Sequence, residues 1–224
     1  MLLLHIYRNR AEAAGQLADL LQAYANRPDV LVLALPRGGV PIAFEIAKRL
    51  NAALDLMLVR KLGVPGNEEL AMGAVAAGGT RVLNEEVVNG LALSDEIIER
   101  VAAAELQELE RRERLYRGEH PAPRLQGRCV ILVDDGLATG ATMRAAIAVV
   151  RYQQPSEVVV AVPVAPPATV EALRHEAEAV ICPAMPEPFL GIGRWYEDFA
   201  QVTDEEVRTL LERAWQHRPA PEAS

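Results

Sequence analysis

The sequence lacks a hydrophobic run long enough to span a bilayer, and it contains only two cysteines. Its first ten residues place their charges after a short apolar stretch, which is unlike a secretory signal peptide. Cys129 and Cys182 each border an apolar segment without metal-ligand spacing, so we expect two buried thiols and no zinc site. These absences predict a cytoplasmic protein that needs neither a disulfide nor a membrane.

Positive charge is also in short supply, because 23 basic residues stand against 31 acidic ones and give a net charge of −8. That balance argues against binding nucleic acid through overall charge, whereas small phosphorylated ligands are compatible with it. Lysine is the scarcer cation, since only Lys48 and Lys61 occur. The sequence also shows no internal repeat and no G-x-S-x-G elbow, so neither a repeat protein nor a serine hydrolase is indicated.

Half of the 224 residues are hydrophobic, which is enough for one domain with a substantial core. We expect that domain over residues 1–215, followed by a disordered tail at 216–224. Apolar runs typical of strands alternate with helix-like segments, and this order favours an α/β fold with a mostly parallel sheet flanked by helices. The expected strands of that sheet are 30–35, 54–59, 130–133, 157–162 and 179–182.

Three capping patterns predict where helices begin. Asn9 with Glu12 predicts a first helix that runs to about residue 26. Ser94, followed by two acidic residues, predicts a long helix over about 95–116. Thr203 with a glutamate three residues later predicts a final helix whose apolar face packs on the core.

The central feature of the sequence is the stretch from Cys129 to Arg144, CVILVDDGLATGATMR. Its apolar run ends in two aspartates, and a turn of small residues follows. In the next segment apolar residues recur at helical spacing. This order is typical of a buried strand, an acidic loop and a helix. A phosphate at 139–142 would meet backbone N–H groups at the positive end of the helix dipole, while paired carboxylates suit a vicinal diol. The stretch therefore predicts a sugar with two hydroxyls at one end and a phosphate at the other.

The segment VILVDDGLATGAT resembles the signature of the type I phosphoribosyltransferases, which bind 5-phosphoribosyl-1-pyrophosphate (PRPP). A Rossmann-like loop or a receiver-type aspartate cluster would not account for the acidic pair and the TGxT-type turn together. The resemblance implies the type I phosphoribosyltransferase fold, a homodimer, and a small hood from the N-terminus and about 183–200. It also implies PRPP contacts from the motif residues Asp134, Asp135, Ala138, Thr139, Gly140, Ala141 and Thr142.

A glycine pair in LPRGGV, residues 35–40, extends the resemblance. A glycine pair alone is more often a turn than a phosphate site. In this context the segment resembles the family's pyrophosphate loop, in which a strained or non-proline cis peptide turns an N–H toward the pyrophosphate. The resemblance therefore implies PRPP contacts from Arg37, Gly38 and Gly39.

Residues 60–69 combine two cations with glycine and proline, which is typical of a charged, mobile loop. The resemblance places the family's flexible catalytic loop here, with Lys61 as the pyrophosphate contact and Arg60 beside it. A solvated surface loop is the alternative interpretation.

The residues that would bind the acceptor resemble those of the family less closely than the PRPP motif does. Ala138 stands where transferases of 6-oxopurines carry an aspartate, which weakens a hypoxanthine or guanine assignment. Adenine-type members draw on a flexible-loop glutamate, for which Glu68 or Glu69 is the nearest candidate. Trp195 and Tyr196 could stack a planar base under the hood, and the alternative is that they pack against the terminal helix. The identity of the acceptor therefore stays open.

The resemblance implies transfer of the 5-phosphoribosyl group from PRPP to a nitrogenous base, with release of pyrophosphate. Mg²⁺ is the implied cofactor, held by Asp134 and Asp135 through water and PRPP. The expected catalytic residues are these two aspartates, Lys61 and Glu68. Two other functions compete with transfer, namely a PRPP-sensing regulatory protein without turnover and a hydrolase of PRPP.

Overall fold

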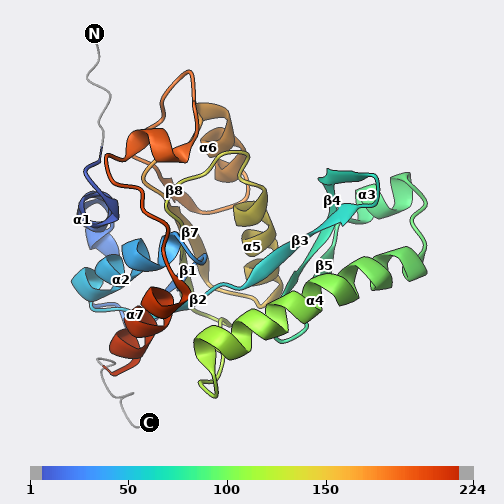
Figure 1. The fold of residues 1–224 in the computed structure, drawn as a ribbon, viewed down its shortest axis with the longest axis horizontal. Helices are drawn as coiled ribbons and strands as arrows, with labels where there is room; N and C mark the ends of the chain where they lie inside the picture. Colours follow the sequence, from blue (N-terminus) through green and yellow to red (C-terminus); the bar gives the residue numbers. More distant parts are fainter. Residues whose placement is uncertain (1–6, 217–224) are drawn as a thin grey trace.

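The fold is built on a five-stranded sheet (Figure 1). The apolar residues of its strands are buried on both faces. The fold is known from a computed structural model that describes residues 7–216, apart from the side chain of Glu69. The strands lie in the order β2-β1-β6-β7-β8, and each neighbouring pair is parallel, which confirms the predicted sheet. The bounds are β1 (Val30–Ala34), β2 (Ala53–Leu56), β6 (Cys129–Val133), β7 (Glu157–Ala161) and β8 (Ala179–Ile181).

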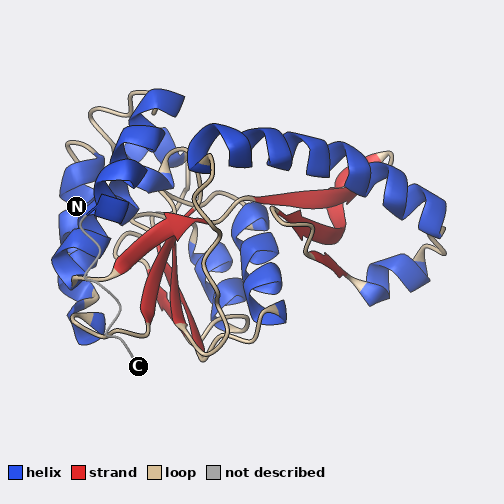
Figure 2. Cartoon of the chain, turned by 90° about the horizontal axis from the view of Figure 1, so that it is seen from below, coloured by secondary structure: helices blue, strands red, loops and turns tan. Residues whose placement is uncertain are grey.

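Helices cover both faces of this sheet (Figure 2). One face of β1, which includes Val30 and Val32, packs against α1, α2 and α7. The other face, which includes Leu31 and Leu33, packs against α5 and α6. Burial on both faces explains why the strands are unbroken apolar runs rather than alternating ones. The helices are α1 (Arg10–Leu20), α2 (Gly39–Leu50), α5 (Ala141–Tyr152), α6 (Pro167–Arg174) and α7 (Asp204–Gln216).

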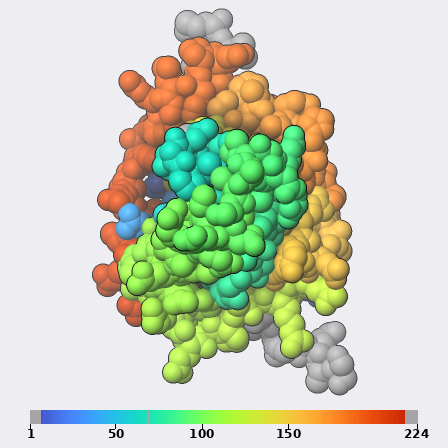
Figure 3. Space-filling model, turned by 90° about the vertical axis from the view of Figure 1, so that its right-hand side faces the viewer, coloured from blue at the N-terminus to red at the C-terminus, as the bar shows by residue number. Residues whose placement is uncertain are grey.

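A three-stranded antiparallel sheet extends from this core as an arm (Figure 1). Figure 3 views the arm from its far end, where its green and cyan surface stands in front of the orange and yellow C-terminal half. The long helix α4 lies along the arm and packs against β3 and β4. The elements of the arm are β3 (Val59–Val64), β4 (Asn67–Ala76), β5 (Arg81–Leu83), α3 (Glu85–Gly90) and α4 (Asp95–Arg117).

The expectation of a loop at residues 60–69 is wrong. Arg60 and Lys61 lie on β3, and the chain turns back into β4 near Gly66, where φ is 82°. The apolar residues of β3 are buried while the two cations are half-buried, which is how a strand on a half-exposed sheet is built. A register shift next to Leu62 interrupts the alternation of buried and exposed side chains along β3. The alternating pattern that would indicate a strand is therefore not visible in the sequence.

The three predicted helix caps are present in the structure. Side-chain oxygens of Asn9, Ser94 and Thr203 each accept a hydrogen bond from the backbone N–H three residues further on. The first helix is shorter than predicted, because α1 ends at Leu20 and a 3₁₀ helix, Gln22–Tyr24, follows it. Helix α3 had no counterpart among the sequence predictions.

The N-terminal and C-terminal segments that were predicted to form a hood lie side by side. Tyr7 forms a parallel bridge with Tyr196, and its N–H donates to the carbonyl of Trp195 at 2.8 Å. Residues 1–6 and the predicted tail from 217 onward lie outside the described residues, while Gln216 is the last residue of α7. Within the described part of the chain, no helix has both the length and the apolar character needed to cross a membrane.

Candidate active site

The acidic pair lies at the carboxyl edge of β6, the central strand of the sheet. β6 ends one residue before Asp134, so both aspartates follow where the chain leaves the sheet. The N–H of Asp135 donates to Oδ1 of Asp134 at 2.8 Å, which orients the first carboxylate. Open parallel sheets bind ligands at this edge, so the pair stands where a ligand is expected.

The turn after the acidic pair leads directly into α5. Gly140 adopts a left-handed conformation at the helix N-cap, with φ 74°, which glycine tolerates best. The N–H of Ala141 donates to Oγ1 of Thr139 at 3.4 Å, and Thr139 and Thr142 are exposed. The first N–H groups of a helix have no partner within it and lie at its positive end. The turn can therefore accept an anion such as a sugar phosphate.

The loop between β1 and α2 packs directly against the acidic pair. A Cβ on Gly38 would overlap the carboxylate of Asp135, and a Cβ on Gly39 would lie 2.6 Å from the last carbonyl oxygen of β6. Only glycine allows so close an approach. The peptide bond between Pro36 and Arg37 is cis, as the resemblance implied for this loop.

Arg10 is a residue of this site that sequence reasoning missed. Its Nη2 and Nε donate to Oδ2 of Asp135 at 2.7 and 3.0 Å, and its Nη1 donates to the carbonyl of Ala200 at 2.7 Å. Its guanidinium lies 4.1 Å from the ring centre of Phe199, and Tyr196 donates its hydroxyl to the carbonyl of Asp135 at 2.7 Å. No local pattern could reveal these contacts, because Arg10 and Asp135 are 125 positions apart.

Removing Arg10 is expected to weaken the structure around the acidic pair. Only 13% of the Arg10 side chain and 12% of the Asp135 side chain is exposed, so Arg10→Ala leaves a carboxylate without its partner in a poorly solvated position. We expect a loss of about 2 to 3 kcal/mol in the free energy of unfolding, measured by urea titration. Arg8→Ala is the matched control, because Arg8 is exposed; an equal loss in both variants would contradict this role.

The two aspartates are poorly solvated and close to each other. Burial and the charge of Asp135 raise the pKa of Asp134 well above its usual value. Burial also raises the pKa of Asp135, although the hydrogen bond and charge of Arg10 act in the opposite direction. A cation or hydroxyl donors brought by a ligand would favour the charged form of the pair, so ligand binding and proton release are coupled.

This coupling predicts a specific pH dependence. At a pH below the raised pKa of Asp134, binding of PRPP with Mg²⁺ is expected to release protons, because the ligand lowers that pKa. The affinity should therefore rise with pH through this window and level off above it. Calorimetry in two buffers of different ionisation enthalpy measures the release. The same proton count in Asp134→Asn would contradict the assignment to this carboxylate.

The arm contributes a cavity of about 670 Å³ beside the motif helix. Arg60, Lys61 and Glu68 of β3 and β4 line it together with Thr142 of α5 and Pro36 of the glycine loop. The structure thus brings three predicted site residues of the arm next to Thr142, in the turn that was predicted to bind a phosphate. The aspartate pair is not part of this lining and lies at the end of β6.

Two arginines of the predicted PRPP set are paired with carboxylates. Arg60 donates to Glu105 of α4 at 2.6 Å, and Arg37 lies 3.5 Å from Asp204 at the start of α7. Asp204 also accepts the hydroxyl of Tyr116 at 2.6 Å. A phosphorylated ligand that uses these cations must compete with the carboxylates for them.

Trp195 and Tyr196 lie inside the structure, each only 6% exposed. They form a cluster with Tyr7, and the ring of Tyr196 stacks on Phe199 with ring centres 4.9 Å apart. Burial raises the pKa of the Tyr196 hydroxyl, whose proton is donated to the carbonyl of Asp135. The two rings therefore have a packing role, and a contact with the acceptor stays a prediction.

Substitution separates these two roles. Trp195→Ala is expected to lower the free energy of unfolding by about 3 to 5 kcal/mol, because it empties a buried aromatic position. Leu190→Ala is the matched control from the same segment, since Leu190 is 68% exposed. Thermal melts and acceptor saturation at fixed PRPP measure both effects. A raised acceptor KM with an unchanged melting temperature would contradict the packing role of Trp195.

Residues 7–216 contain no group of three or more histidine, cysteine or carboxylate side chains arranged to hold a metal. Mg²⁺ in particular often needs only one or two carboxylates, with waters and ligand phosphates completing its shell. The acidic pair at the end of β6 has that chemistry. The donor set therefore fits a magnesium ion that arrives with a phosphorylated ligand.

Comparison with known proteins agrees with this geometry. The phosphoribosyl transferase domain family matches residues 4–189. Two Mycobacterium tuberculosis proteins, one from strain CDC 1551 and one from strain H37Rv, carry names that assign them provisionally to the phosphoribosyl transferases. Each is 46% identical over 219 residues, which is 97% of this chain and 48% of the relative. The chain thus spans about half the length of these curated relatives.

A solved structure is also similar over most of the chain. The crystal structure of TT1426 from Thermus thermophilus is 44% identical, with a TM-score of 0.86. The similarity covers 93% of this chain and 98% of that one. The family match includes the two aspartates, the turn at residues 139–142, the glycine loop at residues 35–40 and the cations of β3. It ends before Trp195. The chain belongs to the phosphoribosyl transferase domain family.

Proposed function

We propose that this chain transfers the 5-phosphoribosyl group of PRPP to a nitrogen acceptor, with release of pyrophosphate. The observation that carries the proposal is the arrangement at the end of β6. The pair of aspartates, the N-terminus of α5 and the glycine loop meet there, and they offer acceptors for a diol and donors for a phosphate group. Family membership supports the same activity.

Different residues are assigned to different parts of PRPP. Asp134 and Asp135 accept the hydroxyls of the ribose, and the turn from Thr139 to Thr142 holds the 5-phosphate. Charge-assisted hydrogen bonds of this kind contribute about 1.5 to 3 kcal/mol each. Gly38 and Gly39 let their loop pack directly against the end of β6 and Asp135, and this close approach leaves the pyrophosphate next to the loop where it joins the sugar.

Catalysis rests on charge that appears only as pyrophosphate departs. The bond between C1 and the pyrophosphate oxygen breaks, a bond from the acceptor nitrogen to C1 forms, and the acceptor loses a proton. Lys61 and Arg60 face the arm cavity and stabilise the departing pyrophosphate. Glu68 lines the same cavity and takes the role of the loop carboxylate that exchanges a proton with the acceptor.

Magnesium is part of the proposal. Asp134 and Asp135 would hold the ion through water and the ribose hydroxyls. When bound, the ion neutralises charge on pyrophosphate and so makes it a better leaving group. The homodimer and the cytoplasmic location implied at the outset stay predictions.

A nucleobase is the proposed acceptor, and Ala138 in place of an aspartate argues against 6-oxopurines. The test is to incubate the protein with Mg²⁺, PRPP and a panel of purine and pyrimidine bases. Pyrophosphate and nucleotide are measured together. Transfer predicts that one base yields both products. Pyrophosphate with ribose 5-phosphate would indicate a hydrolase, and PRPP binding without any product would indicate a regulatory sensor.

A further inference from the structure

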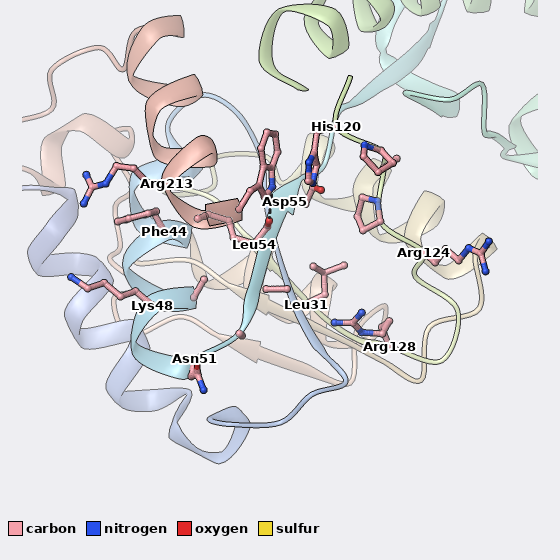
Figure 4. Close-up of a pocket in the computed structure, with 18 residues that line it drawn as sticks. Leu31, Phe44, Lys48, Asn51, Leu54, Asp55, His120, Arg124, Arg128 and Arg213 are labelled. Atoms are coloured by element: carbon pink, nitrogen blue, oxygen red, sulfur yellow. Dashed lines mark hydrogen bonds between the residues drawn. The ribbon is translucent and has the colours of Figure 1, made fainter. Parts of the chain in front are cut away.

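A second cavity lies away from the candidate active site, beside the edge strand β2. Its volume is about 550 Å³, within the range of small-ligand sites. The wall is formed by the last turns of α2 and α7, by β2, and by the connection that leads into β6 (Figure 4). Helix α2 begins at Gly39 in the glycine loop and ends at Leu50 beside this cavity, so the two sites lie at opposite ends of one helix.

The cavity is rich in positive charge. Four cationic side chains line it, with Lys48 and Arg213 at one side and Arg124 and Arg128 at the other (Figure 4). Lys48 and Arg124 are exposed, and among residues 7–216 no carboxylate lies within ion-pair distance of either of them. Such a concentration of cations is unexpected in a chain of net charge −8 and favours an anionic ligand.

The lone carboxylate of the lining does not offset these charges. Asp55 is buried, and its carboxylate accepts hydrogen bonds from Arg117 of α4 and from the N–H of Leu56. Arg117 is itself buried, so its charge is matched to Asp55 within the protein. The net charge that a ligand would meet in the cavity is therefore positive.

The same cavity has a fixed aromatic wall. The indole N–H of Trp215 donates to the carbonyl of Leu54 at 3.2 Å, which anchors its ring against β2. The ring of His120 stacks on Trp215 with ring centres 3.8 Å apart and planes 10° apart. Phe44 lies 5.0 Å beneath the guanidinium of Arg213. Flat rings next to cations suit a ligand that is both planar and negatively charged.

We propose that this cavity is a second binding site, for a nucleotide. Its heterocycle packs against the wall of Trp215, His120 and Leu54, and its phosphates reach Lys48 or Arg124 at the rim. An apolar ligand would leave these cations unused, and a free phosphate would leave the aromatic wall unfilled. The inference goes beyond the proposed function and does not depend on it.

The test uses Trp215 as a local reporter. The chain has two tryptophans, so Trp195→Phe leaves Trp215 as the single tryptophan, beside the cavity. This variant is titrated with ADP, adenosine and pyrophosphate. ADP is expected to change the fluorescence saturably, with at least about tenfold tighter binding than either fragment, since each makes only part of the contacts. No saturable change at millimolar ADP would overturn the proposal.

Charge removal at the rim tests the site itself. Lys48→Gln and Arg124→Gln, made in the same background, are expected to weaken ADP binding about tenfold in at least one variant. Arg100→Gln removes an exposed cation from α4 and serves as the matched control. Both rim side chains are exposed, so the melting temperature should not change. Unaltered affinity in both rim variants, or an equal loss in the control, would overturn the proposal.

The candidate active site must be separated from this cavity, because nucleotides are products of the proposed reaction. Asp134→Asn with Asp135→Asn disables the PRPP motif, and ADP binding reported by Trp215 should persist in that background. Loss of the signal there would place the nucleotide at the motif and overturn the second site. Failure of the proposed transfer alone would leave this result unaffected.

Discussion

Asp134→Asn combined with Asp135→Asn is expected to lower the affinity for PRPP about a hundredfold to ten-thousandfold, because two charged acceptors of the ribose hydroxyls are lost. Neither residue belongs to the apolar clusters that form the core. Asparagine keeps the size of the side chain and an acceptor oxygen for Arg10. Burial favours a neutral side chain at position 134, whereas Asp135→Asn removes the charge that pairs with Arg10, so the double variant should fold with a lower melting temperature.

The single variants sharpen this prediction. Oδ2 of Asp135 already accepts two hydrogen bonds from Arg10, whereas among residues 7–216 the side chain of Asp134 accepts one, from the N–H of Asp135. Asp134→Asn should therefore cause the larger loss of affinity. Calorimetric titration with PRPP and Mg²⁺ measures each effect, with a thermal melt to verify folding. A folded double variant with unchanged affinity would remove the central role of the motif.

Lys61→Ala is expected to lower kcat by about a hundredfold to a thousandfold, the range observed when a group that stabilises developing negative charge is removed. Lys61 lines the arm cavity next to Arg60 and Thr142. Since the charge on pyrophosphate grows during bond cleavage, the affinity for PRPP should change much less than turnover.

Separate measurement of PRPP affinity and kcat distinguishes this role from simple anchoring. Arg100→Ala is the matched control, because it removes an exposed cation from α4 that lines neither cavity. Unchanged kcat with a raised KM in Lys61→Ala would make Lys61 an anchor of the ground state. A similar fall in kcat for both variants would point to the overall charge rather than to this lysine.

The parallel sheet and the motif could be predicted because their determinants are local. β6 is an unbroken apolar run followed at once by Asp134 and Asp135, and the glycine at position 140 marks the start of α5. The capping residues Asn9 and Ser94 likewise stand next to the helices that they begin. In such cases neighbouring residues carry the whole signal.

Features built from distant residues could not be predicted. β3 is a strand because Arg60 and its neighbours pair with β4, and the pattern in the sequence is interrupted by a register shift. The contact between Arg10 and Asp135 joins the start of α1 to the end of β6. The burial of Trp195 depends on Tyr7, which lies far from it in the chain. Such pairings follow from the tertiary fold and leave no local pattern.

The fate of the ribose carbon tests the central claim most directly. PRPP labelled with ¹³C at C1 is incubated with the protein, Mg²⁺ and the panel of bases, and the product is followed by ¹³C NMR together with released pyrophosphate. The account predicts that C1 becomes bonded to nitrogen in an amount equal to the pyrophosphate, and that Asp134→Asn with Asp135→Asn stops both. Labelled carbon that appears only in ribose 5-phosphate, or that stays in PRPP with every base, would contradict it.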